Sequence, residues 1–251
     1  MDKKRQYNVM DVCLLAGKIL LQNGAETFRV EDTMLRMAAA FGYTKCESFV
    51  IPTGIIFSLQ SLEAEKTKLI RVSERTTNLL KITQVNRISR MISEEKMTIE
   101  DAQAALEKIE HAKFAFSIYT QVLAAALSSA CFVIMFLGTW HDFIPALIVG
   151  AIGYVSYLTF NHLVSVKFIS EFLASIVIGI CSYLMVQTGI GLEIDKIIIG
   201  SVMPLVPGLL ITNAVRDLMA GHLVSGMSKG ADALLTAFAI GAGIAMVLTL
   251  V

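Results

Sequence analysis

Residues Ser201–Ser228, SVMPLVPGLLITNAVRDLMAGHLVSGMS, decide the fold. The stretch begins as an apolar membrane span and is interrupted by Pro204, Pro207 and Gly208. Proline lacks a backbone donor and clashes with the preceding helical turn, so the pattern predicts a helix that opens in its middle. Backbone groups freed inside a bilayer must be satisfied by protein, water or a ligand. The stretch is therefore a candidate site within the membrane, although a proline kink without a ligand also fits it.

The overall composition indicates a membrane protein with a water-soluble first half. The chain has 251 residues, of which 55% are hydrophobic, and a mean hydropathy of +0.66. Soluble proteins of this length are less apolar. Of the 42 charged side chains, 31 precede Lys113 and 11 lie in the 139 residues from Lys113 onward. We therefore expect a cytoplasmic α+β domain over residues 1–112 and a transmembrane domain over residues 113–251.

Five apolar segments in the second half suit the roughly 17–25 residues that a membrane-spanning helix needs. They cover residues 117–137, 143–160, 168–188, 197–212 and 231–251. The predicted fold class is an α-helical polytopic membrane protein with five transmembrane helices, the fourth broken by proline and glycine, preceded by the small α+β domain. In the last span Ala237, Gly241 and Ala245 recur every four residues, which favours close packing inside the bundle or against another subunit.

The distribution of basic residues predicts the orientation. The charged N-terminus is followed by no apolar run of useful length, so a secretory signal is not expected. Lys167, Arg216 and Lys229 lie in connectors on the same side as the first half, whereas the opposite side holds only Lys196. Basic residues favour the cytoplasmic side. We expect a protein of the bacterial inner membrane with its N-terminal domain in the cytoplasm and its C-terminus outside.

The first half carries the patterns of two helices, three strands and two further helices. Each of the first two helices is followed by a glycine suited to a helix C-terminus, and Pro52-Thr53-Gly54 is typical of a hairpin turn. Thr98 is the expected N-cap of the last helix. The predicted helices cover residues 8–23, 26–41, 78–92 and 98–112, and the predicted strands cover residues 47–51, 55–59 and 67–72.

The start of the second helix is crowded with charge, at Glu26, Arg29 and Glu31. These residues form either a solvated first turn, favoured by the helix dipole, or a contact with the membrane half or a partner chain. The first 110 residues contain no histidine, and neither a phosphate loop nor a metal-ligand spacing is present. The sequence therefore predicts no enzyme, no metal and no cofactor. The four cysteines are widely spaced, and no strongly basic stretch indicates a nucleic-acid partner.

Several charged residues lie in or beside the apolar segments, where charge is costly and typical of functional sites. Asn213, Arg216 and Asp217 have i, i+3, i+4 spacing and share one helical face. Arg216 can hold a carboxylate with two parallel hydrogen bonds, and Asp217 can pair with Arg216 or carry a proton. Glu171 in the third span either reaches the interface or takes part in transport. Asp232 opens the fifth span as an N-cap or a second proton-carrying group.

The stretch Pro204–Gly243, PLVPGLLITNAVRDLMAGHLVSGMSKGADALLTAFAIGAG, resembles the threonine/serine exporter family. The P-x-x-P-G break, the N-A-x-R-D-L motif, the G-x-x-x-S-G turn and the acidic residue opening the last span carry the resemblance. G-A-E-T-F-R-V-E and P-T-G-I in the first half resemble the cytoplasmic domain of that family. By its length the chain looks like the larger subunit of the split, two-protein members, including those associated with succinate export. This implies a smaller, all-membrane partner subunit, and the small-residue seam also allows a homo-oligomer.

The resemblance implies a subunit of a secondary active, ion-coupled exporter for small hydrophilic metabolites. The substrate is then threonine or serine, or a C4-dicarboxylate such as succinate. The alternatives are a membrane-tethered, hydrolase-like enzyme and a regulatory or scaffold subunit of a transport complex. For the exporter, the expected substrate-binding residues are Pro204, Pro207, Gly208, Asn213 and Arg216, and the expected proton-coupling residues are Asp217, Glu171 and Asp232. The orientation puts Asn213, Arg216 and Asp217 at the cytoplasmic mouth of the site.

Overall fold

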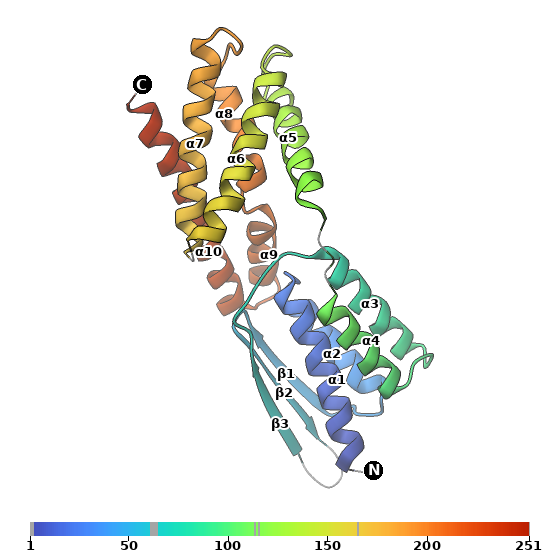
Figure 1. Cartoon of the computed structure of the whole chain (residues 1–251). Coiled ribbons are helices and arrows are strands. Elements are labelled where there is room, and N and C mark those ends of the chain that lie inside the picture. The colour runs from blue at the N-terminus through green and yellow to red at the C-terminus, as the bar shows by residue number, and fades with distance from the viewer. Residues whose placement is uncertain (1–2, 61–64, 113, 115, 165, 251) are drawn as a thin grey trace. The chain divides into compact units, whose positions relative to one another are not determined.

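The computed structural model describes residues 3–60, 65–112, 114, 116–164 and 166–250 (Figure 1). The chain divides into two compact units. The α+β unit comprises Met1–Phe114 and Leu209–Gly230, and the helical unit comprises Ala115–Gly208 and Ala231–Val251. The segment after the proline break thus clusters with the first half of the chain, not with the apolar helices. The expected boundary at Lys113, the expected end at Val251 and the Lys167 side chain fall outside the described residues.

The expected elements of the first half are present. The helices are α1 (Lys3–Gln22), α2 (Thr27–Ala40), α3 (Leu79–Ser93) and α4 (Ile99–His111). Gly24 and Gly42 follow α1 and α2 with φ of +90° and +94°, a left-handed conformation that glycine adopts without a Cβ penalty. The Thr98 hydroxyl caps α4 by accepting a hydrogen bond from the Asp101 N–H.

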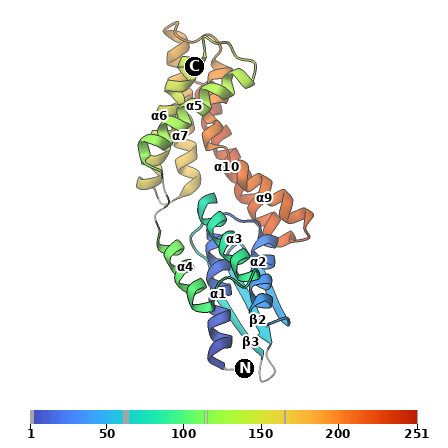
Figure 2. The same cartoon turned by 90° about the vertical axis from the view of Figure 1, so that its right-hand side faces the viewer.

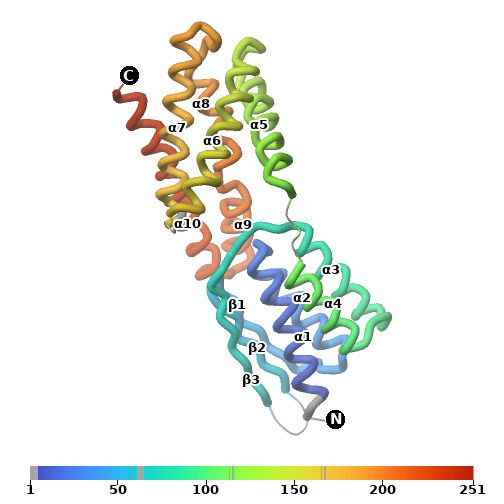
Figure 3. Tube along the Cα trace, in the orientation of Figure 1, coloured from blue at the N-terminus to red at the C-terminus, as the bar shows by residue number. Residues whose placement is uncertain are grey.

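The strands β1 (Cys46–Ile51), β2 (Gly54–Gln60) and β3 (Glu65–Arg71) form an antiparallel sheet in the order β1-β2-β3. Ile51 pairs with Gly54, so the predicted hairpin turn is confirmed. The Cα trace in Figure 3 follows the strands as a meander. One sheet face packs against α1 and α2 (Figure 2). Val50, Ile55, Phe57 and Leu59 are buried, because alternate strand residues point to opposite faces.

Helix α1 forms the centre of this unit, since it contacts α2, α3, α4 and β2. Its buried residues include Val9, Val12, Cys13 and Ile19, spaced for one broad helical face. Burial raises the pKa of the Cys13 thiol, which makes this cysteine an inert core residue. The C-terminus of α1 and the start of α2 therefore pack directly into the core of this unit.

The helical unit contains α5 (Ile118–Met135), α6 (Phe143–Leu163), α7 (Lys167–Gln187), α8 (Ile194–Val202), η1 (Met203–Leu205) and most of α10 (Leu223–Leu248). Among the described residues, α5, α6, α7 and α10 are long and apolar enough to cross a membrane. A fifth candidate consists of α8 and η1 followed by α9 (Gly208–Met219). The chain is thus a mostly helical, polytopic membrane protein, and five remains the predicted number of spans.

Close helix crossings in the helical unit depend on small residues. A Cβ on Gly150 of α6 would lie 2.2 Å from Ser129 Oγ of α5, and a Cβ on Gly153 would lie 2.4 Å from Ile178 of α7. The Ala237, Gly241 and Ala245 seam of α10 is different, because all three residues are exposed. Among the described residues, nothing outside the backbone of its own helix lies within 4 Å of the Cβ position of Gly241. The seam is therefore left open by the part of the chain that the structure describes.

The proline break lies where the sequence predicts it. Pro204 lies in η1, Pro207 precedes α9, and Gly208 is the first residue of α9. The connector to the last span is shorter than expected, since α9 ends at Met219 and α10 begins at Leu223. Asp232 consequently lies inside α10 and does not cap it. The expectation that Asp232 is the N-cap of the last helix was wrong. The apolar pattern begins at residue 231, whereas α10 already begins at Leu223.

Candidate functional site

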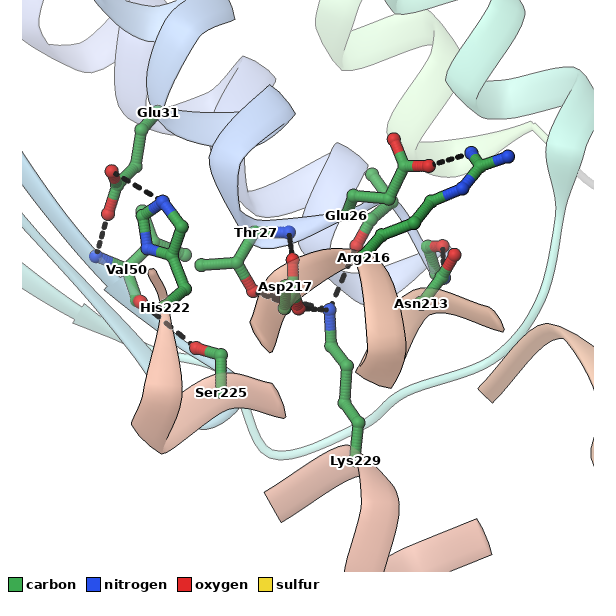
Figure 4. A network of polar contacts seen from close by, with 12 residues as sticks. Glu26, Thr27, Glu31, Val50, Asn213, Arg216, Asp217, His222, Ser225 and Lys229 are labelled. Atoms are coloured by element: carbon green, nitrogen blue, oxygen red, sulfur yellow. Dashed lines mark hydrogen bonds and ion pairs between the residues drawn. The ribbon is translucent and has the colours of Figure 1, made fainter. Parts of the chain in front are cut away.

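The part of the α+β unit that follows the break carries a buried ion pair (Figure 4). The Asp217 carboxylate of α9 is fully buried and lies 2.7 Å from Lys229 Nζ of α10, which is 6% exposed. A buried charge is tolerated only when it is paired and hydrogen-bonded. Asp217 meets this requirement, because it also accepts hydrogen bonds from the Thr27 N–H and the Thr27 hydroxyl, each at 2.9 Å.

Asp217 caps α2 from a distant part of the chain. Glu26 is the N-cap residue of α2, but its side chain makes no capping hydrogen bond. The first backbone N–H groups of a helix have no partner within the helix. Asp217 satisfies the Thr27 N–H and brings negative charge to the positive end of the helix dipole. The pairing of Asp217 with Arg216, one of the two expected alternatives, does not occur.

Lys229 completes the network from α10. Its ammonium donates to Asp217, to the Thr27 hydroxyl at 3.2 Å and to the Ala25 carbonyl at 3.3 Å. These three hydrogen bonds match the three donors of a lysine ammonium. The sequence pattern indicates only a role in orientation for Lys229 and does not single out Thr27. The available signal was a lysine in an otherwise apolar and small-residue stretch.

A second cluster centres on Glu26, whose side chain is only 6% exposed. Its carboxylate pairs with Arg216 of α9 and, at 3.4 Å, with Arg29 of α2. Both arginine side chains are more than half exposed. Asn213 donates its side-chain amide to the Gly24 carbonyl at 2.8 Å. Helix α9 therefore turns its Asn213, Arg216 and Asp217 face toward the junction between α1 and α2.

A third cluster lies at strand β1. The Val50 N–H donates to Glu31 at 2.8 Å, and Ser225 of α10 donates to the Val50 carbonyl at 3.3 Å. These contacts satisfy edge-strand groups that would otherwise be open to pairing. Glu31 also lies 3.7 Å from His222 Nε2. Burial raises the pKa of Glu31, and the Asp217 charge adds to the rise, although the Val50 N–H and His222 act against it.

A cavity of about 200 Å³ lies beside the Glu26 cluster in the α+β unit. Its polar lining includes Arg29, Asn86 and Arg216, and its apolar lining includes Leu20, Leu79 and Ile82. The cavity thus combines two guanidinium groups with an apolar wall. No group of three His, Cys, Asp or Glu side chains that could hold a metal ion occurs in the described ranges.

The remaining expected site residues belong to the helical unit. Pro204, Pro207 and Gly208 form the break, Glu171 is buried in α7, and Asp232 is half-buried in α10. Glu171 is 3% exposed, which is uncommon for a carboxylate. The expected residues therefore form two groups. One group surrounds the start of α2, and the other lies among the apolar helices.

A family model and several similar proteins agree with one another on what this chain resembles. The model of the threonine/serine exporter family matches residues 11–251. The "Probable succinate transporter subunit YjjP" of Klebsiella aerogenes is 26% identical over 250 residues, which cover 99% of this chain and 96% of that protein. The Escherichia coli K12 protein of the same name is 26% identical over 255 residues, which cover 100% and 97%. The "Threonine/serine exporter" of Corynebacterium glutamicum is 23% identical over 98% of this chain, which corresponds to 52% of that protein. No solved structure matches the chain.

Proposed function

Because the chain belongs to the threonine/serine exporter family, we propose that it is a subunit of a secondary active exporter. It moves small hydrophilic metabolites out of the cytoplasm and couples this export to an ion gradient. The observation that carries the proposal is the family match over residues 11–251. The candidate substrates are threonine or serine, and a C4-dicarboxylate such as succinate, in agreement with the names of the relatives.

In this proposal the substrate carboxylate binds Arg216, and the opened backbone at Pro204, Pro207 and Gly208 lines its route through the membrane. The Arg216 side chain is 57% exposed and borders the cavity, so a solute can reach it. Asn213 orients the Gly24 carbonyl at the same junction. A guanidinium suits a carboxylate because its N–H donors match the two oxygen atoms.

Coupling protons are carried by Asp217, Glu171 and Asp232. Protonation of Asp217 would remove its negative charge and weaken its contact with Lys229, whose Nζ lies 2.7 Å away. Because this contact ties α9 and α10 to the start of α2, proton binding at Asp217 would loosen that attachment. Glu171 and Asp232 lie in the helical unit and would carry protons along the membrane route.

The chain works with a smaller, all-membrane partner subunit. Two relatives are named as transporter subunits, and the Ala237, Gly241 and Ala245 seam offers a surface for a second helix. We place the complex in the bacterial inner membrane, with the N-terminal domain in the cytoplasm and the C-terminus outside. Labelling of single cysteines introduced at Ser73 and Thr249 of a cysteine-free variant, from each side of the membrane, tests this orientation.

The proposed function is tested by efflux from proteoliposomes that contain the chain and its partner subunit. Labelled threonine and labelled succinate are loaded separately, and efflux is measured with and without a proton gradient. We expect gradient-dependent efflux of one solute and a loss of at least about tenfold in Arg216→Ala, the scale of one lost charge-assisted hydrogen bond. Arg36→Ala, which removes an exposed arginine of α2, serves as the matched control. Wild-type efflux by Arg216→Ala would refute the site, and no efflux of either solute would refute the function.

A further inference from the structure

We propose that the cavity between the α1–α2 junction, α3 and α9 binds a small dicarboxylate through Arg29 and Arg216. This inference deepens the proposed function and rests on it, since it names the substrate class and adds Arg29 as a binding residue. The cavity is formed entirely by residues of the α+β unit. It is a loading site from which solute passes to the membrane route.

The charge of the cavity favours an anion. Two guanidinium groups, Arg29 and Arg216, face one carboxylate, Glu26, which gives a formal charge of +1. Each guanidinium has five N–H donors, and Glu26 occupies only some of them. A dicarboxylate can therefore pair one carboxylate with each arginine. An amino-acid zwitterion would bring an ammonium group into a positive site, where Glu26 is already engaged with both arginines.

The size and the wall of the cavity fit a short carbon chain. A volume of about 200 Å³ lies below the roughly 300–1,000 Å³ of pockets for drug-sized ligands, so it suits a small metabolite. Leu20, Leu79 and Ile82 provide apolar contact for methylene groups, and the two arginines lie on other elements, α2 and α9. The lining thus offers apolar contact for methylene groups beside two cationic groups that one carboxylate, that of Glu26, already bridges.

Glu26 occupies the position of a ligand carboxylate. It bridges Arg29 and Arg216 within the cavity lining, as a bound carboxylate would. An incoming dicarboxylate must therefore compete with Glu26 for the guanidinium donors. This predicts opposite effects for two variants, because Arg29→Gln removes a binding group, whereas Glu26→Gln removes a competing charge.

The test measures ligand binding by the full chain in detergent micelles with isothermal titration calorimetry. The probes are succinate, L-threonine and butyrate, which differ in charge but have four carbon atoms each. We expect succinate to bind most tightly, and Arg29→Gln to weaken its binding at least about tenfold, the scale of a lost charge-assisted hydrogen bond. We expect Glu26→Gln to strengthen succinate binding and Arg36→Gln, the matched control on α2, to leave it unchanged. Thermal unfolding of each variant confirms that it is folded.

The results separate this inference from the proposed function. Threonine binding as tight as succinate binding, unchanged binding by Arg29→Gln, or weaker binding by folded Glu26→Gln would overturn the dicarboxylate site. If Arg29→Gln still exports solute with wild-type kinetics, the cavity is not a loading site, but the exporter function stands. If no solute is exported while succinate binding still depends on Arg29, the binding site stands and the exporter function falls.

Discussion

Glu31 shows how a single side chain can make stability depend on pH. It accepts a hydrogen bond from the Val50 N–H and lies close to His222 and Asp217. Burial raises its pKa above the ordinary value of 4.5. A raised pKa means that the folded state favours the protonated carboxyl. The stability that Glu31 contributes is therefore fully present below about pH 4.5 and is lost as the pH rises through the folded-state pKa.

Replacing Glu31 by glutamine is expected to reduce this pH dependence. Glutamine keeps a carbonyl oxygen for the Val50 N–H but has no titrating group. Between about pH 4.5 and neutrality, Glu31→Gln should lose less stability than the wild type. The measurement is the midpoint of thermal unfolding in detergent across this pH range. Glu47→Gln, an exposed carboxylate of β1, is the control, and identical pH slopes for Glu31→Gln and the wild type would contradict the expectation.

At the scale of elements, the glycines of the apolar helices have two different uses. Gly150 lies where α6 approaches α5, since its Cβ position is 2.2 Å from Ser129 Oγ. Gly241 lies on α10, and outside the backbone of its own helix no described atom lies within 4 Å of its Cβ position. A leucine at Gly150 must therefore displace packed groups of this chain. At Gly241 a Cβ meets no neighbouring element in the described part of the chain, and in our proposal this face contacts the partner subunit.

These two glycines predict opposite outcomes for the same substitution. Gly150→Leu should destabilise the isolated chain by about 1–3 kcal/mol, the usual cost of overpacking. Gly241→Leu should leave the isolated chain unchanged but reduce its co-purification with the partner subunit. Thermal unfolding and affinity purification of the co-expressed subunits measure the two effects. Full recovery of the partner with Gly241→Leu would show that another face of the chain binds it.

At the scale of the whole molecule, Lys229 and Asp217 join parts of the chain that are far apart in sequence. The Thr27 hydroxyl and N–H meet Asp217 across 190 residues, and Lys229 contacts Ala25 across 204 residues. Figure 4 shows these side chains converging at the start of α2. The ion pair is therefore the fully buried part of the contacts that attach the segment after the proline break to the start of α2.

Lys229→Met is expected to weaken this attachment strongly. The substitution leaves the fully buried Asp217 carboxylate without its cation. Removing one partner of a buried pair typically costs about 3–5 kcal/mol, whereas replacing both by neutral groups costs less. Thermal unfolding in detergent should therefore show partial recovery in the Asp217→Asn, Lys229→Met double variant. Lys96→Met, which removes an exposed ion pair with Glu94, is the control. A loss below about 1 kcal/mol for Lys229→Met would mean that solvent reaches Asp217.

The sequence by itself determined the local elements, because their causes are local. Hydrophobic spacing predicted α1–α4, the Pro52-Thr53-Gly54 turn predicted the hairpin, and Pro204 and Pro207 predicted the broken helix. Apolar length predicted the membrane helices. Each of these features depends on neighbouring residues or on a short repeat, so a single chain carries the necessary information.

Only the tertiary structure decided which charged groups meet. The i, i+3, i+4 spacing put Asn213, Arg216 and Asp217 on one helical face, but it could not name their partners in α2. Ion pairs such as Asp217 with Lys229 depend on how the turn at Ala220–His222 folds α10 back beside α9. Charge has no sequence periodicity that reveals contacts across 190 residues. The interrupted stretch from Ser201 to Ser228 was therefore visible in the sequence, whereas its attachment to Thr27 was not.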